Sequence, residues 1–201
     1  MPEDAKKLTE QQAVQLIAAM EQHAAKTPVL ELTPENWEAE FGKDGKVQTP
    51  IGEVKMGEHQ YLKMQAKGRG AELGMVKPTL TVPDAIIEEY DLQEDAERNT
   101  KLLFVKTFID NKGGKYSHFE SVTIKKDGLE VSISSHIVSK KAMLRKLTNG
   151  NIALIKPVIE SNISEWHLDK NQNGLPDLVP SQESTTSDNK GTKISETTKK
   201  I

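Results

Sequence analysis

The chain has 201 residues and a formal net charge of -3 at pH 7, with a hydrophobic content of 35% and a mean hydropathy of -0.58. Such values fit one globular domain of roughly 130 residues diluted by polar, disordered chain. Cysteine is absent, which excludes disulfides, thiolate chemistry and cysteine-based zinc sites. The N-terminal residues 1–12 lack an apolar signal core and no apolar run approaches about 18 residues, so we expect no signal peptide, no membrane span and a cytoplasmic protein.

Two helices are expected at the start of the chain. Residues 8–25 carry apolar side chains at helical spacing, among them Val14 and Ile17, behind Thr9 as an N-cap. A second, short helix begins at Thr33-Pro34, where Thr caps and Pro takes the first helical position. Its Trp37 and Phe41 fall on one face. We treat residues 1–28 as an N-terminal amphipathic helix preceding the main domain.

The segment 43–88 is rich in glycine and in cations. Glycine serves where the backbone takes positive φ or approaches another group closely, so this segment predicts tight turns between short elements. Its lysines, arginine and histidine suit an anionic ligand such as a phosphodiester, because the stretch 55–69 holds few carboxylates. The elements expected are strands at 47–49 and 52–55, a helix at 58–67, an extended run at 73–80, and a helix or turn opening at Pro83-Asp84.

The centre of the chain predicts an antiparallel meander. Apolar and β-branched residues fill 102–109, 116–125 and 129–137, and the turns between them are too short for parallel crossovers. Alternation puts Phe119, Ser121 and Thr123 on one side of the middle strand, and His118, Glu120 and Val122 on the other. We expect His118 to lie on the sheet surface.

A basic helix is expected over 139–147, with Met143, Leu144 and Leu147 inward, and a further strand over 152–155. Order is expected to fade after Pro157, and the Ser-, Thr-, Lys- and Glu-rich composition from Ser181 onward predicts a disordered tail. The predicted fold class is therefore α+β: N-terminal helices, a small antiparallel β-sheet meander, and a C-terminal tail. The main domain spans 29–156 and the tail 157–201.

Several sequence blocks in 29–155 resemble the phage-associated barnase–EndoU–colicin–RelE-like (BECR) nucleases of phages and mobile elements. The resemblance lies in the order of the blocks, since no single block is a diagnostic catalytic motif. It implies helices followed by an antiparallel sheet, and a metal-independent ribonuclease. The blocks are Glu31–Trp37, Gly52–Gly57, Leu73–Leu80, Pro83–Glu88, Phe104–Phe108, Ser121–Thr123 and Asp127–His136.

Metal-independent RNA cleavage requires a base for the 2′-hydroxyl, an acid for the leaving oxygen, and cations for the charge that develops on phosphorus. We assign His136 as acid or base because it ends a strand with a polar face that includes Ser132 and Ser134. Lys55 and Lys106 complete the expected catalytic set, Lys106 because it interrupts an apolar strand. Each of these residues also has an ordinary explanation as a solvated side chain.

The remaining contacts expected for substrate are cations and hydroxyls that can bind phosphate. His59 and Tyr61 are alternatives on the helix at 58–67, although the apolar face of that helix would claim Tyr61. The expected phosphate-binding residues are Arg69, Lys77, Arg98, Ser121, Thr123 and Ser134.

A calcium-loop-like pattern provides an alternative ligand site in the tail. Oxygen-bearing side chains alternate there and a glycine stands at the sixth position, as in an EF-hand loop. Pro180 occupies the place of the bidentate glutamate, which favours an Asn/Gly-rich turn instead. We expect no cofactor, because nucleotide-binding fingerprints and metal-spaced histidines are absent from the sequence. The residues of this pattern are Asp169, Asn171, Asn173 and Asp177.

Three functions are consistent with the sequence. The first is a ribonuclease acting on RNA, including tRNA or translation-associated RNA, with an inhibitor protein as a partner and no membrane association. The second is a non-catalytic RNA- or protein-binding relative of the same fold. The third is a structural or interaction protein of a mobile element.

Overall fold

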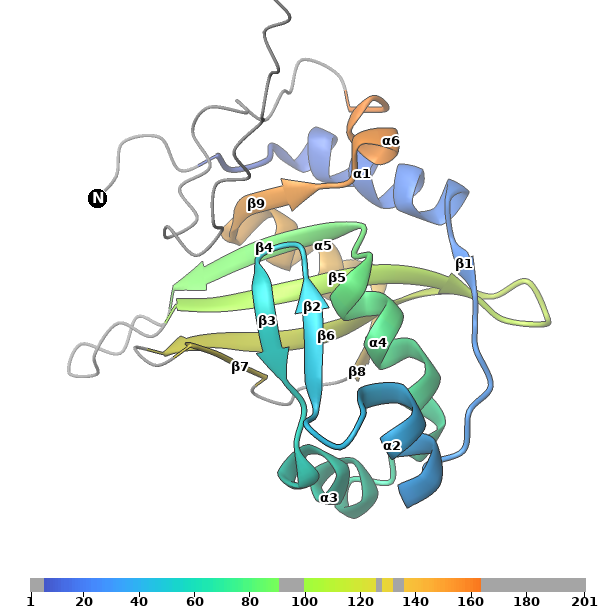
Figure 1. Ribbon diagram of the computed structural model, residues 1–201. Coiled ribbons are helices and arrows are strands. Elements are labelled where there is room, and N and C mark those ends of the chain that lie inside the picture. The colour runs from blue at the N-terminus through green and yellow to red at the C-terminus, as the bar shows by residue number, and fades with distance from the viewer. Residues whose placement is uncertain (1–5, 91–99, 126–127, 132–135, 164–201) are drawn as a thin grey trace, which may run out of the picture.

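The computed structural model describes residues 6–90, 100–125, 128–131 and 136–163. Helices and strands mix in one α+β arrangement (Figure 1), as the sequence predicts. In chain order the elements are α1 (Glu10–Gln22), β1 (Ala25–Lys26), α2 (Pro34–Phe41), β2 (Lys46–Thr49), β3 (Gly52–Lys55), α3 (Glu58–Ala66), the 3-10 turn η1 (Gly70–Glu72), α4 (Leu73–Thr81), β4 (Ala85–Tyr90), β5 (Thr100–Ile109), β6 (Lys115–Lys125), β7 (Gly128–Val131), β8 (His136–Val138), α5 (Lys140–Asn149), β9 (Asn151–Ile155) and α6 (Pro157–Glu160).

The strands form one sheet in the order β2-β3-β7-β6-β5-β4-β9. The long β5–β6 hairpin lies at its centre and pairs antiparallel from Lys101–Thr123 to Ile109–Lys115. The meander over β5, β6 and β7 is thus confirmed. Two pairings are parallel, β1 with β5 and β3 with β7. The sheet is therefore mixed: its antiparallel centre is joined by two parallel pairings with strands from earlier in the chain.

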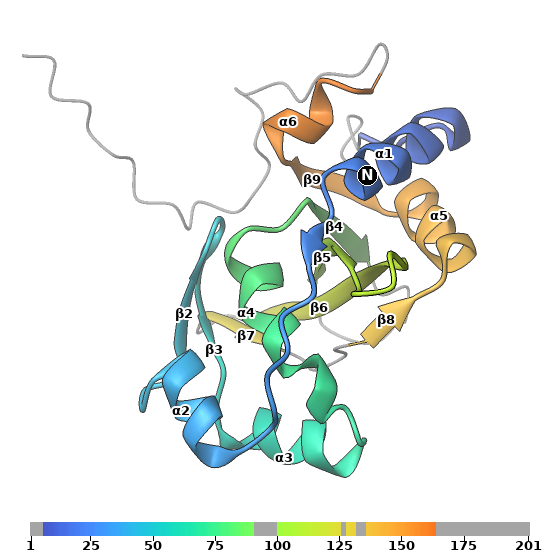
Figure 2. The same ribbon diagram turned by 90° about the vertical axis from the view of Figure 1, so that its right-hand side faces the viewer.

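Helix α4 lies against one face of this sheet, between the β5–β6 hairpin and the β2–β3 hairpin (Figures 1 and 2). Its buried residues occupy most of its circumference, so it is apolar nearly all round. The core on this face includes Phe104 of β5, Val54 of β3, Val76 of α4 and Trp37 of α2.

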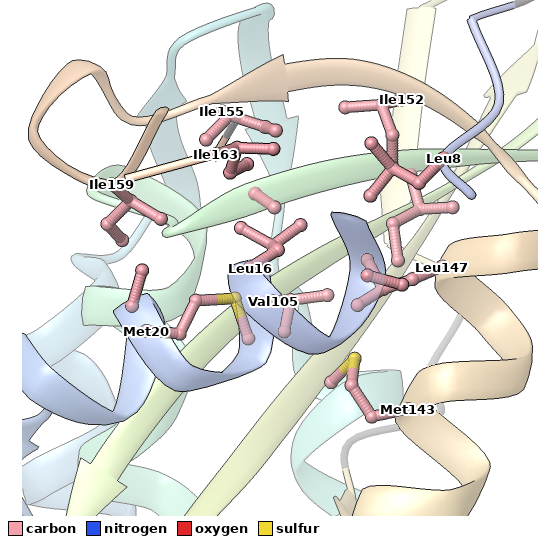
Figure 3. Close-up of a cluster of buried hydrophobic side chains, with 14 of the residues drawn as sticks. Leu8, Leu16, Met20, Val105, Met143, Leu147, Ile152, Ile155, Ile159 and Ile163 are labelled. Atoms are coloured by element: carbon pink, nitrogen blue, oxygen red, sulfur yellow. The ribbon is translucent and has the colours of Figure 1, made fainter. Parts of the chain in front are cut away.

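The opposite face of the sheet is covered by α1, α5 and α6. Figure 3 shows Leu16 and Met20 of α1 and Met143 and Leu147 of α5 gathered around Val105 of β5. Since both faces of the central strands are covered, β5 is buried along nearly its whole length.

Local sequence determines where the helices begin. The Thr9 hydroxyl accepts from the Gln12 N–H at 3.2 Å, in a capping box, and the Ser139 hydroxyl accepts from the Ala142 N–H at 3.3 Å. Thr33 caps α2 in the same way. The predicted helices at 8–25, 33–41, 58–67 and 139–147 and the strands at 47–49, 52–55 and 152–155 are confirmed within a few residues.

Other expectations are wrong. The run expected to be extended over 73–80 is helix α4, because its apolar residues are buried on several sides and Pro78 is accommodated inside the helix. The helix or turn expected after Pro83 is strand β4, whose Ile86 and Ile87 pair with β5 and β9. The strand expected over 129–137 corresponds to β7 and β8, and 132–135 lies outside the described residues.

The buried face of α1 also differs from the face read from its apolar residues. Ala13, Leu16 and Met20 are buried, whereas Val14 is 53% exposed. Order continues past Pro157, because Ile159 and Ile163 join the core beneath α1. Thus α1 and the start of the predicted tail are parts of the main core. The remainder of the tail, 164–201, lies outside the described residues.

At two positions of the segment 43–88, a residue with a Cβ would clash with neighbouring atoms, so glycine is required there. Gly45 has φ of 61°, and a Cβ there would lie 2.0 Å from the Met56 carbonyl oxygen. Gly74 lies inside α4, where a Cβ would lie 2.9 Å from the Pro28 Cβ, because the chain between β1 and α2 crosses the helix there (Figure 2). These glycines permit close backbone approach, as the sequence predicts.

Candidate functional site

Lys106 lies on β5, on the face that packs against α4. Its ammonium donates to the Val82 carbonyl at 2.7 Å and lies 3.6 Å from Asp84 Oδ1. The two charged side chains are 9% and 1% exposed. The contacts of Lys106 are therefore those of a buried ion pair, and its ammonium is largely withdrawn from any phosphate in solvent.

The Asp84 carboxylate is held in place by the backbone at the end of the β4–β5 ladder. Pairing between β4 and β5 starts at Ala85–Val105, so the Thr107 N–H lies beyond the end of that ladder. Asp84 Oδ2 accepts from this N–H at 2.8 Å. Burial raises the pKa of the Asp84 carboxyl, against the lowering effects of this hydrogen bond and of Lys106. Burial likewise lowers the pKa of the Lys106 ammonium, against the raising effect of Asp84.

Lys55 lies elsewhere. It is exposed on β3, next to the buried Val54, and side chains alternate along a strand. Lys55 therefore projects away from the core that Val54 joins, and it lines an open groove between the β2–β3 hairpin and helices α2 and α3. The structure does not bring Lys55 and Lys106 together.

His136 opens β8, and its Cα pairs with that of Phe119 on β6. The side chain of His136 lies outside the described part of the structure. The catalytic set expected from the sequence therefore has one exposed member in the groove, one buried member under α4, and one member whose position is given by its backbone alone.

The expected phosphate ligands are also dispersed. Ser121 and Thr123 are buried and alternate with Glu120 and Val122, so they lie on the sheet face opposite to Lys106. Arg69 follows α3 and Lys77 lies on α4, both half-buried. Arg98, Ser134 and the calcium-loop residues Asp169, Asn171, Asn173 and Asp177 lie outside the described residues.

A cluster of acid–base groups that was not expected from the sequence surrounds His118. This histidine is 0% exposed, contrary to the surface position expected. Its Nδ1 lies 3.1 Å from the Thr79 hydroxyl, and its Nε2 lies 3.7 Å from Glu72 Oε2 and 3.5 Å from Glu120 Oε1. We call Glu72, Thr79, His118 and Glu120 the His118 cluster.

The hydrogen bonds of the Thr79 hydroxyl determine which ring nitrogen of His118 carries a proton. The single hydroxyl proton of Thr79 goes to the Met75 carbonyl at 2.7 Å. The Thr79 oxygen must then accept from His118, which puts a proton on Nδ1. Nε2 consequently faces the carboxylates of Glu72 and Glu120. Glu72, with 17% of its side chain exposed, connects the cluster to solvent.

One pattern in the sequence could have indicated the cluster. Side chains alternate along the strand, so His118 and Glu120 lie on the same face as Val122, which is fully buried. In addition, β5 is apolar on both sides, which requires cover on both faces of the hairpin. Polar residues on either face of this hairpin, such as His118 and Glu120, are therefore expected to be buried.

The groove that contains Lys55 has a volume of about 1060 Å³. Trp37 and Tyr61 form an edge-to-face pair beside it, with ring centroids 5.5 Å apart. Leu62, 51% exposed, adds an apolar side chain. Three lysines and four carboxylates line the groove, so its formal charge is slightly negative. They are Lys43, Lys46, Lys55, Glu38, Asp44, Glu53 and Glu58.

Across the described ranges, no group of three or more histidine and acidic side chains has the geometry of a metal site. The helices in those same ranges include none that is long and apolar enough to cross a membrane. No family model, curated protein or solved structure matches this chain.

Proposed function

We propose that this protein is a ribonuclease that works by general acid–base chemistry at the His118 cluster. The observation that carries the proposal is the contact of an imidazole with two carboxylates and a hydroxyl, at a point where one carboxylate reaches solvent. The sequence resemblance to BECR nucleases supports the same activity.

Glu72 is the group that would touch the RNA, because His118 and Glu120 are enclosed. As a carboxylate it would accept the 2′-hydroxyl proton while the 2′-oxygen bonds to the adjacent phosphorus and the bond from phosphorus to the 5′-oxygen breaks; the protonated Glu72 would then return that proton to the leaving 5′-oxygen. His118 would be a positioning residue: its Nε2 lies 3.7 Å from the Glu72 carboxylate, and its Nδ1 bonds to the Thr79 hydroxyl. This arrangement of a base oriented by a second group is common to many acid–base sites.

The test is cleavage of a labelled RNA by the full chain in EDTA. Glu72→Gln should reduce the rate by roughly 100-fold or more, the usual contribution of a general base. His118→Asn should reduce it and change the pH–rate profile, which a purely structural loss would not do. Glu58→Gln, an exposed glutamate of the groove, is the matched control.

A wild-type rate in folded Glu72→Gln would refute the role of the His118 cluster. Lys55→Ala and His136→Ala, measured in the same assay, test the catalytic set expected from the sequence. If these two variants lose cleavage while Glu72→Gln retains it, the protein is a ribonuclease whose active site lies outside the His118 cluster. Folding of each variant is checked by its thermal unfolding midpoint.

A second candidate function is protein binding without catalysis, and the groove favours it. The groove is open and lies apart from the His118 cluster, none of whose residues lines it. Its four carboxylates would repel a phosphate backbone, whereas alternating charges and exposed Leu62 suit an extended polypeptide. Absence of RNA cleavage and of salt-sensitive RNA binding, together with capture of a peptide that Leu62→Ser abolishes, would favour this function.

A further inference from the structure

We propose that a second, smaller cavity binds a small organic monoanion with an apolar body. The cavity has a volume of about 280 Å³ and lies between α1, α5 and the strands β5, β6 and β8. It is on the sheet face opposite to the His118 cluster, since its strand residues Thr107 and Ser117 alternate with Lys106 and His118. The inference does not depend on the proposed ribonuclease activity.

One side of this cavity is apolar. Ile17 of α1, Ile137 and Val138 of β8, and Met143 of α5 line it. Figure 3 shows Met143 extending from α5 toward α1 over the sheet. Ile17 and Val138, which pairs with Ser117, are half-buried, so a ligand placed here would cover apolar surface that now contacts water, which stabilises the complex.

The other side carries a pair of hydroxyls that can act as donors. Thr107 Oγ1 and Ser117 Oγ lie 3.2 Å apart, and either can be the donor. One bond between two hydroxyls uses only one of their two protons. The structure gives no acceptor for the second proton among the described residues, and Thr107 is 1% exposed. A ligand acceptor would complete the pair.

Charge at the cavity selects an anion. Lys140 forms an ion pair with Glu21 at 2.6 Å, joining α5 to α1 beside the cavity. Lys115 supplies a further cation, so Glu21, Lys115 and Lys140 together leave a formal charge of +1. A cavity of about 280 Å³ has room for an aromatic or short aliphatic carboxylate.

The probe is benzoate, a monoanion of about nine non-hydrogen atoms with a flat apolar body. Benzamide, its neutral counterpart, and inorganic phosphate, an anion without an apolar body, are the comparison ligands. Binding to the full chain is measured by titration calorimetry and by chemical-shift changes of Ser117 and Val138. We expect saturable binding of benzoate, weaker binding of benzamide, and none of phosphate in this cavity.

Three variants locate the site. Ser117→Ala and Thr107→Val should each weaken benzoate binding by roughly three- to tenfold, the effect of one lost hydrogen bond. Lys115→Met should weaken benzoate by at least about twofold and leave benzamide unchanged. Lys112→Met, an exposed lysine of the adjoining turn, is the control and should leave binding unchanged.

Absence of saturable benzoate binding to the wild-type chain would overturn the proposal. Equal affinities for benzoate and benzamide would overturn the anion preference. Unchanged affinity in both Ser117→Ala and Lys115→Met would place any binding elsewhere and would also overturn it. Because Ser117 is only half-buried, its alanine variant keeps the test valid even if Thr107→Val does not fold.

Discussion

The buried ion pair of Lys106 and Asp84 makes a sharp prediction about stability. Lys106→Met keeps the length and apolar stem of the side chain but leaves the Asp84 carboxylate, 1% exposed, without its nearest cation. It also removes the donor to the Val82 carbonyl. Breaking a buried pair in this way costs about 3–5 kcal/mol of unfolding free energy. The double variant Lys106→Met/Asp84→Asn removes both charges and should recover most of that loss.

The two single variants should depend on pH in opposite ways. In Lys106→Met, the pKa of Asp84 is raised further because burial is no longer opposed by Lys106, although Lys156 still opposes it. The folded variant then keeps the Asp84 proton to a higher pH than the folded wild type does, so its deficit of unfolding free energy relative to the wild type grows as pH rises through that range, which lies above 3.8. In Asp84→Asn, the pKa of Lys106 is lowered further, because burial and Lys156 both act in that direction. This deficit shrinks as pH rises toward 10.5.

Urea unfolding of the wild type and the three variants, at several values between about pH 5 and pH 9, tests this reasoning. Asn at position 84 keeps an acceptor for the Thr107 N–H, so the comparison isolates charge from hydrogen bonding. A loss below about 1 kcal/mol in Lys106→Met would show that the pair is hydrated in solution. Deficits that change with pH in the same direction in both single variants would contradict the assignment of the charges.

Two further substitutions test the packing. Leu16→Ala in α1 should lower the unfolding free energy by about 2–5 kcal/mol because Leu16 is fully buried. Its control, Val14→Ala, should change the unfolding free energy by less than about 0.5 kcal/mol. Equal effects of the two substitutions would refute the observed buried face of α1. Gly150→Ala should cost about 1–3 kcal/mol, because its Cβ would lie 2.3 Å from Ile87 Cγ2. Asn149→Ala, at the exposed neighbouring position, is the control, and thermal or urea unfolding measures all four.

Local interactions made much of this fold predictable. Thr9, Thr33 and Ser139 satisfy N–H groups three residues away, so the helix starts could be read from sequence. The same holds for the β5–β6 hairpin, whose strands are joined by the short turn 110–114 and alternate as expected. These features depend on neighbours along the chain.

The wrong predictions concern segments that are enclosed on several sides. Residues 73–81 are apolar nearly all round because three parts of the chain cover α4, and such a run has no helical periodicity to read. His118 was placed on the surface because the cover over its face comes from Glu72 and Thr79, about forty residues earlier. Burial of this kind is decided by contacts between distant segments.

The sequence by itself determined the α+β class, the helix caps, the central meander and the need for glycine where backbones approach closely. It also identified chemically suitable residues, since a lysine or histidine can be recognised in any context. Only the tertiary structure decided which of them share a site: it placed Lys55 in an open groove, Lys106 against Asp84, and His118 between two glutamates. The physical reason is that charge and proton affinity depend on burial and on partners within a few ångströms, and those partners come from distant parts of the chain.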